Sequence, residues 1–545
     1  MAMRIKINKT LVLIFILALF LRFIKLDSFP VSLSWDEVAI GYNAYSIAQK
    51  GVDEYGTAYP LLFRSFDDYK LPGYIYTDAI FIKLFGFSDT IVRLPSALFG
   101  ALLTLIVYFL FKKLFGQKVG IISSFLISIS PWSLQFSRGA FEANLGLFVT
   151  VSGITLLLYG FKNRFVAFIS IPVLFSSLYF YYSQRLIVPL IFIAFFVVFR
   201  KRVKPNIKQY LLGFLIGSII LLPIIFQILG PNGFKRVNEV SIISDQSVSL
   251  DYLLAREKNN DSFYGFLINR RIPYFTTIAH NYFQHFSPGF IFFGDDPNPR
   301  HRSYLHGLFY VLEIPLIIIG LFLLWKSKKK EEKMFIIFWI IVAPLTSALS
   351  TEAPHGLRSL LLMPPLILLV SLAVEKAINT SKKTAFILFF LYGLFFVNYA
   401  ISYYLVYPIS SVSWGYGYKQ MYEKVFAIEK NFDRIIITGN YWKPRIYYQY
   451  YRKSLSDKIG QDENFETINK YYFAPTFWDG GKFWGTKEIG NISSDKALVV
   501  LSQKEFESFG KNSNLTKIGE IKDYSGRKVI FVIAEWNLTK NKEMD

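Results

Sequence analysis

An acidic pair follows the first long apolar run of the chain, residues 11–26, in the motif Ser34-Trp35-Asp36-Glu37. Carboxylates at the end of such a run lie where a lipid-borne substrate meets water. One of them could take the proton of an attacking hydroxyl as a general base. The ordinary alternative is a solvated helix start, because Ser34 is a suitable N-cap and acids favour the first turn of a helix.

Cationic side chains stand at the predicted outer ends of other apolar runs. Fixed cations beside an apolar region could bind a substrate phosphate and stabilise the charge it gains as a leaving group. Each of them could instead reach lipid headgroups by snorkelling, so one alone is ambiguous. The candidates are Lys70, Arg93, Arg138, Arg185, His355 and Arg358.

Composition indicates a polytopic α-helical membrane protein, since 53% of the 545 residues are hydrophobic and 18% are aromatic. The net charge of +21 comes from basic residues gathered between apolar runs, such as Arg200-Lys201-Arg202. That pattern is explained by membrane topology and contact with membrane lipids, so no nucleic-acid partner is expected. The absence of cysteine excludes disulfides and thiol nucleophiles.

The apolar runs predict about eleven membrane spans. Arg4, Lys6 and Lys9 precede the first run, which places the N-terminus in the cytoplasm and, after eleven spans, the C-terminus outside. The first run lacks a small-residue cleavage site, so we interpret it as a retained anchor. The predicted spans are 10–26, 91–111, 119–137, 143–161, 165–182, 186–200, 210–229, 307–325, 334–350, 357–374 and 384–406.

Three polar stretches fall on the predicted outer side: loops 27–90 and 230–306 within a membrane domain of residues 1–406, and a separate domain of residues 407–545. In the first loop, Val38 to Ala48 and Tyr74 to Leu84 are amphipathic and predict helices along the membrane interface. The last stretch alternates helical and β-branched segments, which predicts a small α/β domain.

The first outer loop resembles the start of GT-C glycosyltransferases in the order and spacing of four segments. The closest likeness is to protein O-mannosyltransferases and aminoarabinose transferases. The resemblance covers most of the membrane portion and implies inverting transfer from a polyprenyl-phosphate sugar, a hexose or a pentose, at the extracytoplasmic face. The segments are Ser34-Trp35-Asp36-Glu37, Tyr69-Lys70-Leu71-Pro72-Gly73-Tyr74, Lys83-Leu84-Phe85-Gly86-Phe87-Ser88 and Val92-Arg93-Leu94-Pro95-Ser96-Ala97.

The resemblance also implies residue roles. Asp36 corresponds to the proposed base with Glu37 as its neighbour, and Lys70 to the contact with the donor phosphate. Glu142, four residues after Arg138, takes the place of a second acid, where the family more often has Asp. The remaining expected donor-phosphate contacts are Arg93, Arg138, His355 and Arg358.

Other members of the superfamily differ from this chain. Oligosaccharyltransferases carry Trp-Trp-Asp-Tyr-Gly, of which Phe477-Trp478-Asp479-Gly480 offers only fragments, and Asp67-Asp68 are adjacent rather than separated as Asp-x-Asp. Metal-dependent asparagine glycosylation is therefore disfavoured. The five histidines, together with Asp295 and Asp296, could bind a divalent metal, but their spacing fits no standard ligand pattern; the sequence therefore predicts no cofactor and does not support a metal site.

Two classes of function remain. A transferase requires acids and cations that meet in a cavity at the outer membrane border, whereas a lipid-linked sugar transporter or flippase requires ionisable groups near the bilayer midplane and repeated halves. Charged residues are scarce within the predicted spans and no repeat is apparent. The sequence thus favours a transferase with a protein, lipid or glycan acceptor, located in the cell membrane.

Overall fold

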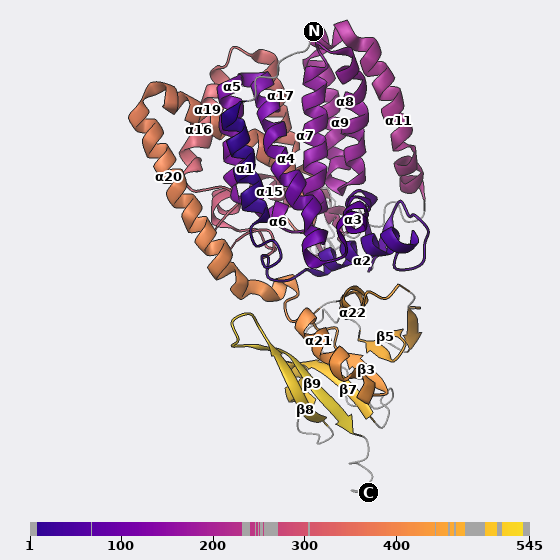
Figure 1. Cartoon of the computed structure of the whole chain (residues 1–545). Helices are drawn as coiled ribbons and strands as arrows, with labels where there is room; N and C mark the ends of the chain where they lie inside the picture. The colour runs from indigo at the N-terminus through magenta and orange to yellow at the C-terminus, as the bar shows by residue number, and fades with distance from the viewer. Residues whose placement is uncertain are drawn as a thin grey trace.

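The computed structural model of the protein describes residues 8–66, 68–230, 240–245, 247, 248, 250, 254, 271–303, 306–441, 443–455, 458–462, 465–474, 496–509 and 515–537. Within these ranges the chain forms a bundle of apolar helices and, beyond one end of it, a domain built on a β-sheet (Figure 1). The segment Phe477 to Gly480, Asp67 and much of the predicted loop 230–306 lie outside the described residues.

Each predicted apolar run coincides with a helix. A helix satisfies its backbone groups internally except at its two ends, which suits a segment whose side chains are mostly apolar. The helices are α1 Lys9–Phe23, α4 Asp89–Phe115, α5 Gln117–Ile129, α6 Pro131–Arg138, α7 Glu142–Tyr159, α8 Arg164–Ser176, α9 Tyr182–Val198, α11 Ile207–Leu229, α16 Glu313–Lys326, α17 Lys330–Val342, α19 Met363–Thr380 and α20 Lys382–Ile401.

The predicted count of eleven spans is not confirmed. Among the described residues, five helices are long and apolar enough to cross a membrane, or six if the bent pair α5 and α6 is one span. Several apolar runs form helices that are shorter than the runs themselves: α1 has 15 residues, α16 has 14 and α17 has 13. A membrane helix usually needs about 20 residues, so these three helices are too short to be counted with the five.

The bend of 55° between α5 and α6 directs α6 along the end of the bundle. Pro131 begins α6 and has no backbone N–H, so the carbonyls at the end of α5 need other donors. Arg22 of α1 supplies them, because its guanidinium donates to the carbonyls of Ile127 at 3.3 Å and Ser128 at 3.2 Å. A buried arginine therefore stabilises the break that precedes the Arg138 to Glu142 segment.

The first outer loop contains the two expected helices, α2 (Trp35–Lys50) and α3 (Pro72–Phe85), with the hairpin of β1 (Phe63–Ser65) and β2 (Asp68–Lys70) between them. Helix α3 exposes Leu84 and Phe85, as a helix at the interface should. Helix α2 is buried instead, since it lies between the bundle and the C-terminal domain (Figure 1).

The C-terminal domain is α/β, as predicted, and its sheet has the order β4-β5-β6-β3-β7-β9-β8. The central strand β3 is parallel to β6 and β7, and the other pairs are antiparallel. The elements are α21 Tyr418–Ile428, β3 Arg434–Ile437, α22 Pro444–Arg452, β4 Gly460–Asp462, β5 Phe465–Ile468, β6 Tyr471–Phe473, β7 Lys496–Ser502, α24 Gln503–Phe509, β8 Leu515–Lys522 and β9 Val529–Asn537.

Helix α22 joins this domain to the first outer loop. The buried Arg445 donates to Glu54 at 3.0 Å and to Glu466 at 2.9 Å, and so bridges the loop and strand β5. Burial raises the pKa of Glu54, although Arg445 acts in the opposite direction. The Tyr447 hydroxyl donates to the carbonyl of Leu33 at 3.0 Å, immediately before the Ser34 motif.

We predict that Arg445→Met destabilises the full-length protein by about 3–5 kcal/mol, because it leaves the buried Glu54 without its cation. Arg452 of the same helix is the matched control, since its side chain is 40% exposed and its pair with Glu429 should contribute at most about 1 kcal/mol. Chemical unfolding of the purified protein measures both. If Arg445→Met and Arg452→Met lowered the free energy of unfolding equally, the anchoring role of the buried Arg445 would be contradicted.

Candidate active site at the end of the bundle

Asp36 lies in the first turn of α2, and its position is set by a capping box. The Ser34 hydroxyl accepts from the backbone N–H of Glu37, and the backbone N–H of Ser34 donates to the Glu37 carboxylate at 2.9 Å. These two bonds satisfy free N–H groups at the helix start. Ser34 is thus the N-cap that the sequence predicted, and Asp36 is half-buried in the first turn of the helix.

Glu37 is buried and ties the helix start to the bundle. Its side chain is 2% exposed and its partner Arg93 is 1% exposed, with 2.8 Å between Arg93 Nε and Glu37 Oε1. The same oxygen accepts from the backbone N–H of Ala140 at 3.0 Å, in the connection between α6 and α7. Glu37 therefore joins α2, α4 and the α6–α7 connection.

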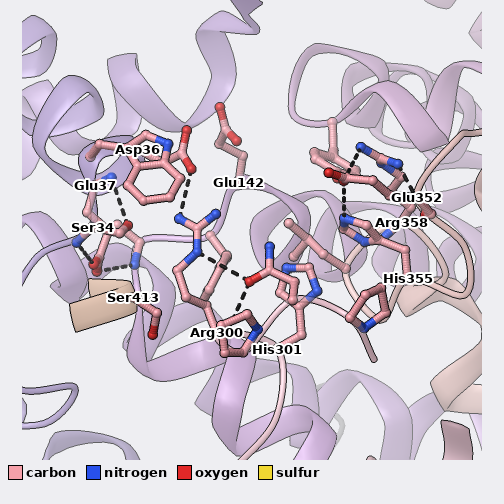
Figure 2. Close-up of a pocket in the computed structure, with 18 of the residues that line it drawn as sticks. Ser34, Asp36, Glu37, Glu142, Arg300, His301, Glu352, His355, Arg358 and Ser413 are labelled. Carbon is pink, nitrogen blue, oxygen red and sulfur yellow. Dashed lines mark hydrogen bonds and ion pairs between the residues drawn. The ribbon is translucent and has the colours of Figure 1, made fainter. Parts of the chain in front are cut away.

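Asp36 is held by two cations that come from distant parts of the chain. Lys70 Nζ lies 2.7 Å from Oδ1 and Arg300 Nη1 lies 3.0 Å from Oδ2 (Figure 2 shows the Arg300 contact). Lys70 ends strand β2, directly before α3. The Arg300 guanidinium also lies over the Trp35 ring, 4.3 Å from its centroid, in cation–π geometry that fixes its plane.

These charges keep Asp36 ionised. Burial alone would raise the pKa of Asp36, but Lys70 and Arg300 lower it well below its usual value. In the same way, burial lowers the pKa of Lys70 while Asp36 and Glu142 raise it, and the net change is upward. At neutral pH the site therefore holds a carboxylate between two cations.

The Asp36 carboxylate faces a cavity of about 380 Å³ with acidic, cationic and aromatic walls (Figure 2). Elements from both the first outer loop and the later outer segments form these walls, so segments far apart in sequence converge here. The residues that line it include Trp35, Asp36, Glu37, Lys70, Glu142, Tyr181, Arg300, His301, Glu352, His355, Arg358 and Ser413.

Two of the predicted donor-phosphate contacts do not line this cavity. Arg93 is engaged by Glu37 and by the carbonyl of Pro30 at 2.7 Å. Arg138 donates to carbonyls at the end of α1, including those of Leu21 at 2.7 Å and Ile24 at 2.8 Å. The C-terminal carbonyls of a helix need such donors, so this geometry gives Arg93 and Arg138 a role in holding the first loop against the bundle.

The other six predicted site residues, Asp36, Glu37, Lys70, Glu142, His355 and Arg358, all line the cavity. At the end opposite Asp36, Arg358 donates to the Ser350 hydroxyl at 2.8 Å and to Glu352 at 3.2 Å. The backbone N–H of Arg358 donates to His355 Nδ1 at 3.2 Å. Burial and the nearby Arg358 lower the pKa of His355, so its ring is neutral and presents Nε2–H as a donor.

Sequence reasoning gave no role to Arg300 or His301. Both belong to the run Arg300-His301-Arg302, which follows Asp295 and Asp296 closely, and this cluster of charged residues was the available signal. Asp296 accepts from the His301 ring at 3.1 Å and from the backbone N–H of Gly356 at 2.6 Å, so it orients His301. Within the described part of the chain, no cluster of three or more metal-ligating side chains occurs.

A second cavity, of about 490 Å³, borders the first at Tyr181 and Arg358. Its walls are mostly apolar and include Leu186, Ile228 and Leu349. A molecule with a charged head and a hydrocarbon tail could therefore place its head near Arg358 and its tail among these side chains.

Part of the sequence matches a known family. Residues 70–226 match the family described as dolichyl-phosphate-mannose-protein mannosyltransferase. No curated protein sequence matches the chain. The family match covers the end of the first outer loop and the helices from α3 to α11.

Solved structures cover more of the chain. ArnT from Cupriavidus metallidurans bound to undecaprenyl phosphate is similar with a TM-score of 0.56 and 12% identity, over 96% of this chain and 97% of that one. The Archaeoglobus fulgidus oligosaccharyltransferase in complex with zinc and sulfate is similar with a TM-score of 0.51 and 14% identity, over 90% of this chain and 68% of that one. The same enzyme tethered to an acceptor peptide has a TM-score of 0.49 and 14% identity, over 81% of this chain and 62% of that one.

The chain thus spans about two thirds of the archaeal enzyme but almost the full length of ArnT. The match to ArnT includes the helical bundle and the C-terminal sheet domain. The resemblance to the GT-C superfamily that the first outer loop indicated is confirmed, and the chain has a GT-C fold.

Proposed function

We propose that the protein is a membrane glycosyltransferase that moves a sugar from a polyprenyl-phosphate donor to an acceptor at the extracytoplasmic face, with Asp36 as the general base. The observation that carries this proposal is the ionised Asp36 carboxylate beside Lys70 and Arg300, in a cavity that borders an apolar one. The solved ArnT structure contains undecaprenyl phosphate, and the matched family is named for a dolichyl-phosphate sugar, which support a donor of this class.

The donor occupies both cavities in this proposal. Its prenyl chain lies against the apolar walls near Leu186 and Ile228, and its phosphate lies between Arg358 and Lys70. The neutral His355 donates a hydrogen bond at the same end of the cavity. These donors are already in position, so little free energy is spent on reorganising them when charge develops on the leaving phosphate. They therefore stabilise the transition state more than the ground state.

The chemical step is a direct displacement. The acceptor oxygen forms a bond to the anomeric carbon while the bond from that carbon to the phosphate oxygen breaks, and the electron pair leaves with the phosphate. The acceptor proton passes to Asp36, which acts from the side of the sugar opposite the phosphate and so inverts the anomeric configuration. Glu142 lines the same cavity and serves as a second acid that orients the sugar or the acceptor.

The proposed membrane orientation follows the basic segments: the N-terminus is cytoplasmic, and the cavity and the C-terminal domain lie outside. In Figure 1 the start of α1 lies at the end of the bundle opposite that domain. The charged cavity is built from the loops and helix starts at one end of the bundle, whereas a transporter would need a site between the helices near the midplane.

Asp36→Asn should reduce transfer at least about 100-fold, because the amide keeps the volume of the side chain but cannot accept the acceptor proton. Transfer from a panel of labelled polyprenyl-phosphate sugars, by enzyme reconstituted in lipid, is the measurement. Asp295→Asn is the control, since Asp295 is exposed and does not line the cavity. Transfer by Asp36→Asn at the rate of the unaltered enzyme would reject Asp36 as the base.

Lys70→Ala and Arg358→Ala should each weaken binding of a short-chain polyprenyl phosphate by about tenfold or more, because each removes a charge-assisted hydrogen bond to phosphate. Calorimetric titration of the purified enzyme measures this affinity without turnover. Lys83→Ala provides the comparison, since Lys83 is exposed on α3 and lies outside the cavity. If all three variants bound the lipid phosphate equally well, the donor site would have to lie elsewhere.

Arg300→Gln should move the acidic limb of the pH–rate profile to higher pH. Arg300 is one of two cations that lower the pKa of Asp36, so its loss raises that pKa and reduces the ionised fraction at mildly acidic pH. Arg302→Gln, in the same segment but outside the cavity, should keep the original profile. A profile for Arg300→Gln that differs only in height, with an unmoved acidic limb, would show that Arg300 does not tune the base.

A further inference from the structure

The turn between β8 and β9 is a firmly built loop that presents cations. The Asp523 carboxylate accepts from the Ser525 hydroxyl at 2.8 Å and from the backbone N–H groups of Arg527 at 3.0 Å and Lys528 at 3.3 Å. Tyr524, Arg527 and Lys528 are all exposed. The side chains of Arg527 and Lys528 form no ion pair with any residue that the structure describes.

This turn lies beside the end of helix α20. Figure 1 shows the tip of the β8–β9 hairpin just below the lower end of α20, where the chain turns toward α21. The ring of Tyr524 is 5.7 Å from that of Tyr416, in edge-to-face contact. The contact fixes the turn directly after segment η7 (Tyr407–Trp414).

The apolar face of α20 continues into η7, so its end marks the border of the lipid. Helix α20 buries few of its residues, and large apolar side chains remain exposed to the end of η7. Exposed apolar side chains at that end are Leu405 at 69%, Ile409 at 60% and Val412 at 41%. Aromatic and basic side chains just beyond such a band lie at the level of lipid headgroups.

We propose that the β8–β9 turn, residues 523–528, is a membrane-docking element that binds the phosphates of anionic phospholipids through Arg527 and Lys528, with Tyr524 at the interface. The charge of the turn is complementary to that surface, and the neighbouring η7 exposes the apolar side chains of Ile409 and Val412. This inference rests on the proposed membrane placement but not on the chemistry at Asp36. It gives the C-terminal domain a second attachment, besides its contact with α2.

A labelling experiment tests this docking. The chain has no cysteine, so Ser525→Cys introduces a single attachment point for an environment-sensitive fluorophore. Thr516→Cys is the matched control, because Thr516 pairs with Glu535 at the far end of the same hairpin. The full-length protein is placed in nanodiscs of phosphatidylcholine with or without phosphatidylglycerol, and lipids with a nitroxide headgroup serve as quenchers.

The label at 525 should be quenched strongly in nanodiscs that contain phosphatidylglycerol, and the label at 516 weakly. Arg527→Ala with Lys528→Ala should weaken the contact at 525 on the order of tenfold, because each cation near an anionic surface contributes to binding, whereas Arg527→Lys with Lys528→Arg should preserve it. Equal quenching at the two positions, or quenching at 525 that depends neither on the anionic lipid nor on the two cations, would overturn the proposal. Since no donor or turnover is involved, this outcome is separate from any failure of Asp36 as the base.

Discussion

The buried carboxylate of Glu37 is the constraint on which the site depends. A carboxyl group at this depth costs stability unless hydrogen-bond donors surround it, and here the donors are Arg93 and the backbone N–H groups of Ser34 and Ala140. Arg93 lies on α4, Ser34 at the start of α2 and Ala140 in the α6–α7 connection. Asp36 therefore has a fixed position because its neighbour has no other way to be satisfied. The backbone that carries the base is therefore held in place by hydrogen bonds to Glu37, although it lies at the edge of a loop.

The two cations at Asp36 have more than one role in the proposed reaction. In the structure Lys70 and Arg300 share one carboxylate, and in the reaction they must also face a leaving phosphate. The carboxyl groups of Glu37, Glu142 and Glu352 also line the cavity, so it has cations at both ends but no net positive charge. The individual cations Lys70, Arg300 and Arg358 would hold the phosphate, and the proton that Asp36 accepts frees the first two for the phosphate as its charge grows.

The sequence was sufficient to predict the features that depend on neighbouring residues in the chain. Apolar runs became helices, Ser34 became an N-cap, and Asp36 and Lys70 were selected from their places in one loop and meet in the structure. The count of eleven spans is not confirmed, because several apolar runs in the sequence are longer than the helices they form. Arg138 shows the other limit, since a helix-end arginine that caps α1 and one that faces a cavity have the same sequence signature. Arg300 reaches Asp36 from 264 residues away, a contact that no spacing rule predicts.

The C-terminal domain contributes to the geometry of the base from the opposite side. Tyr447 holds the carbonyl of Leu33, immediately before Ser34, while Arg445 holds Glu54, a few residues after the end of α2. The helix that carries Asp36 is thus fixed at both ends by α22 and at its start by Glu37 and Arg93. A loop anchored on only one side could shift as a substrate bound. Anchoring from the bundle and from the domain together leaves the side chains of Asp36, Lys70 and Arg300 as the parts free to respond to a bound phosphate, so the electrostatic change of the reaction stays within the cavity.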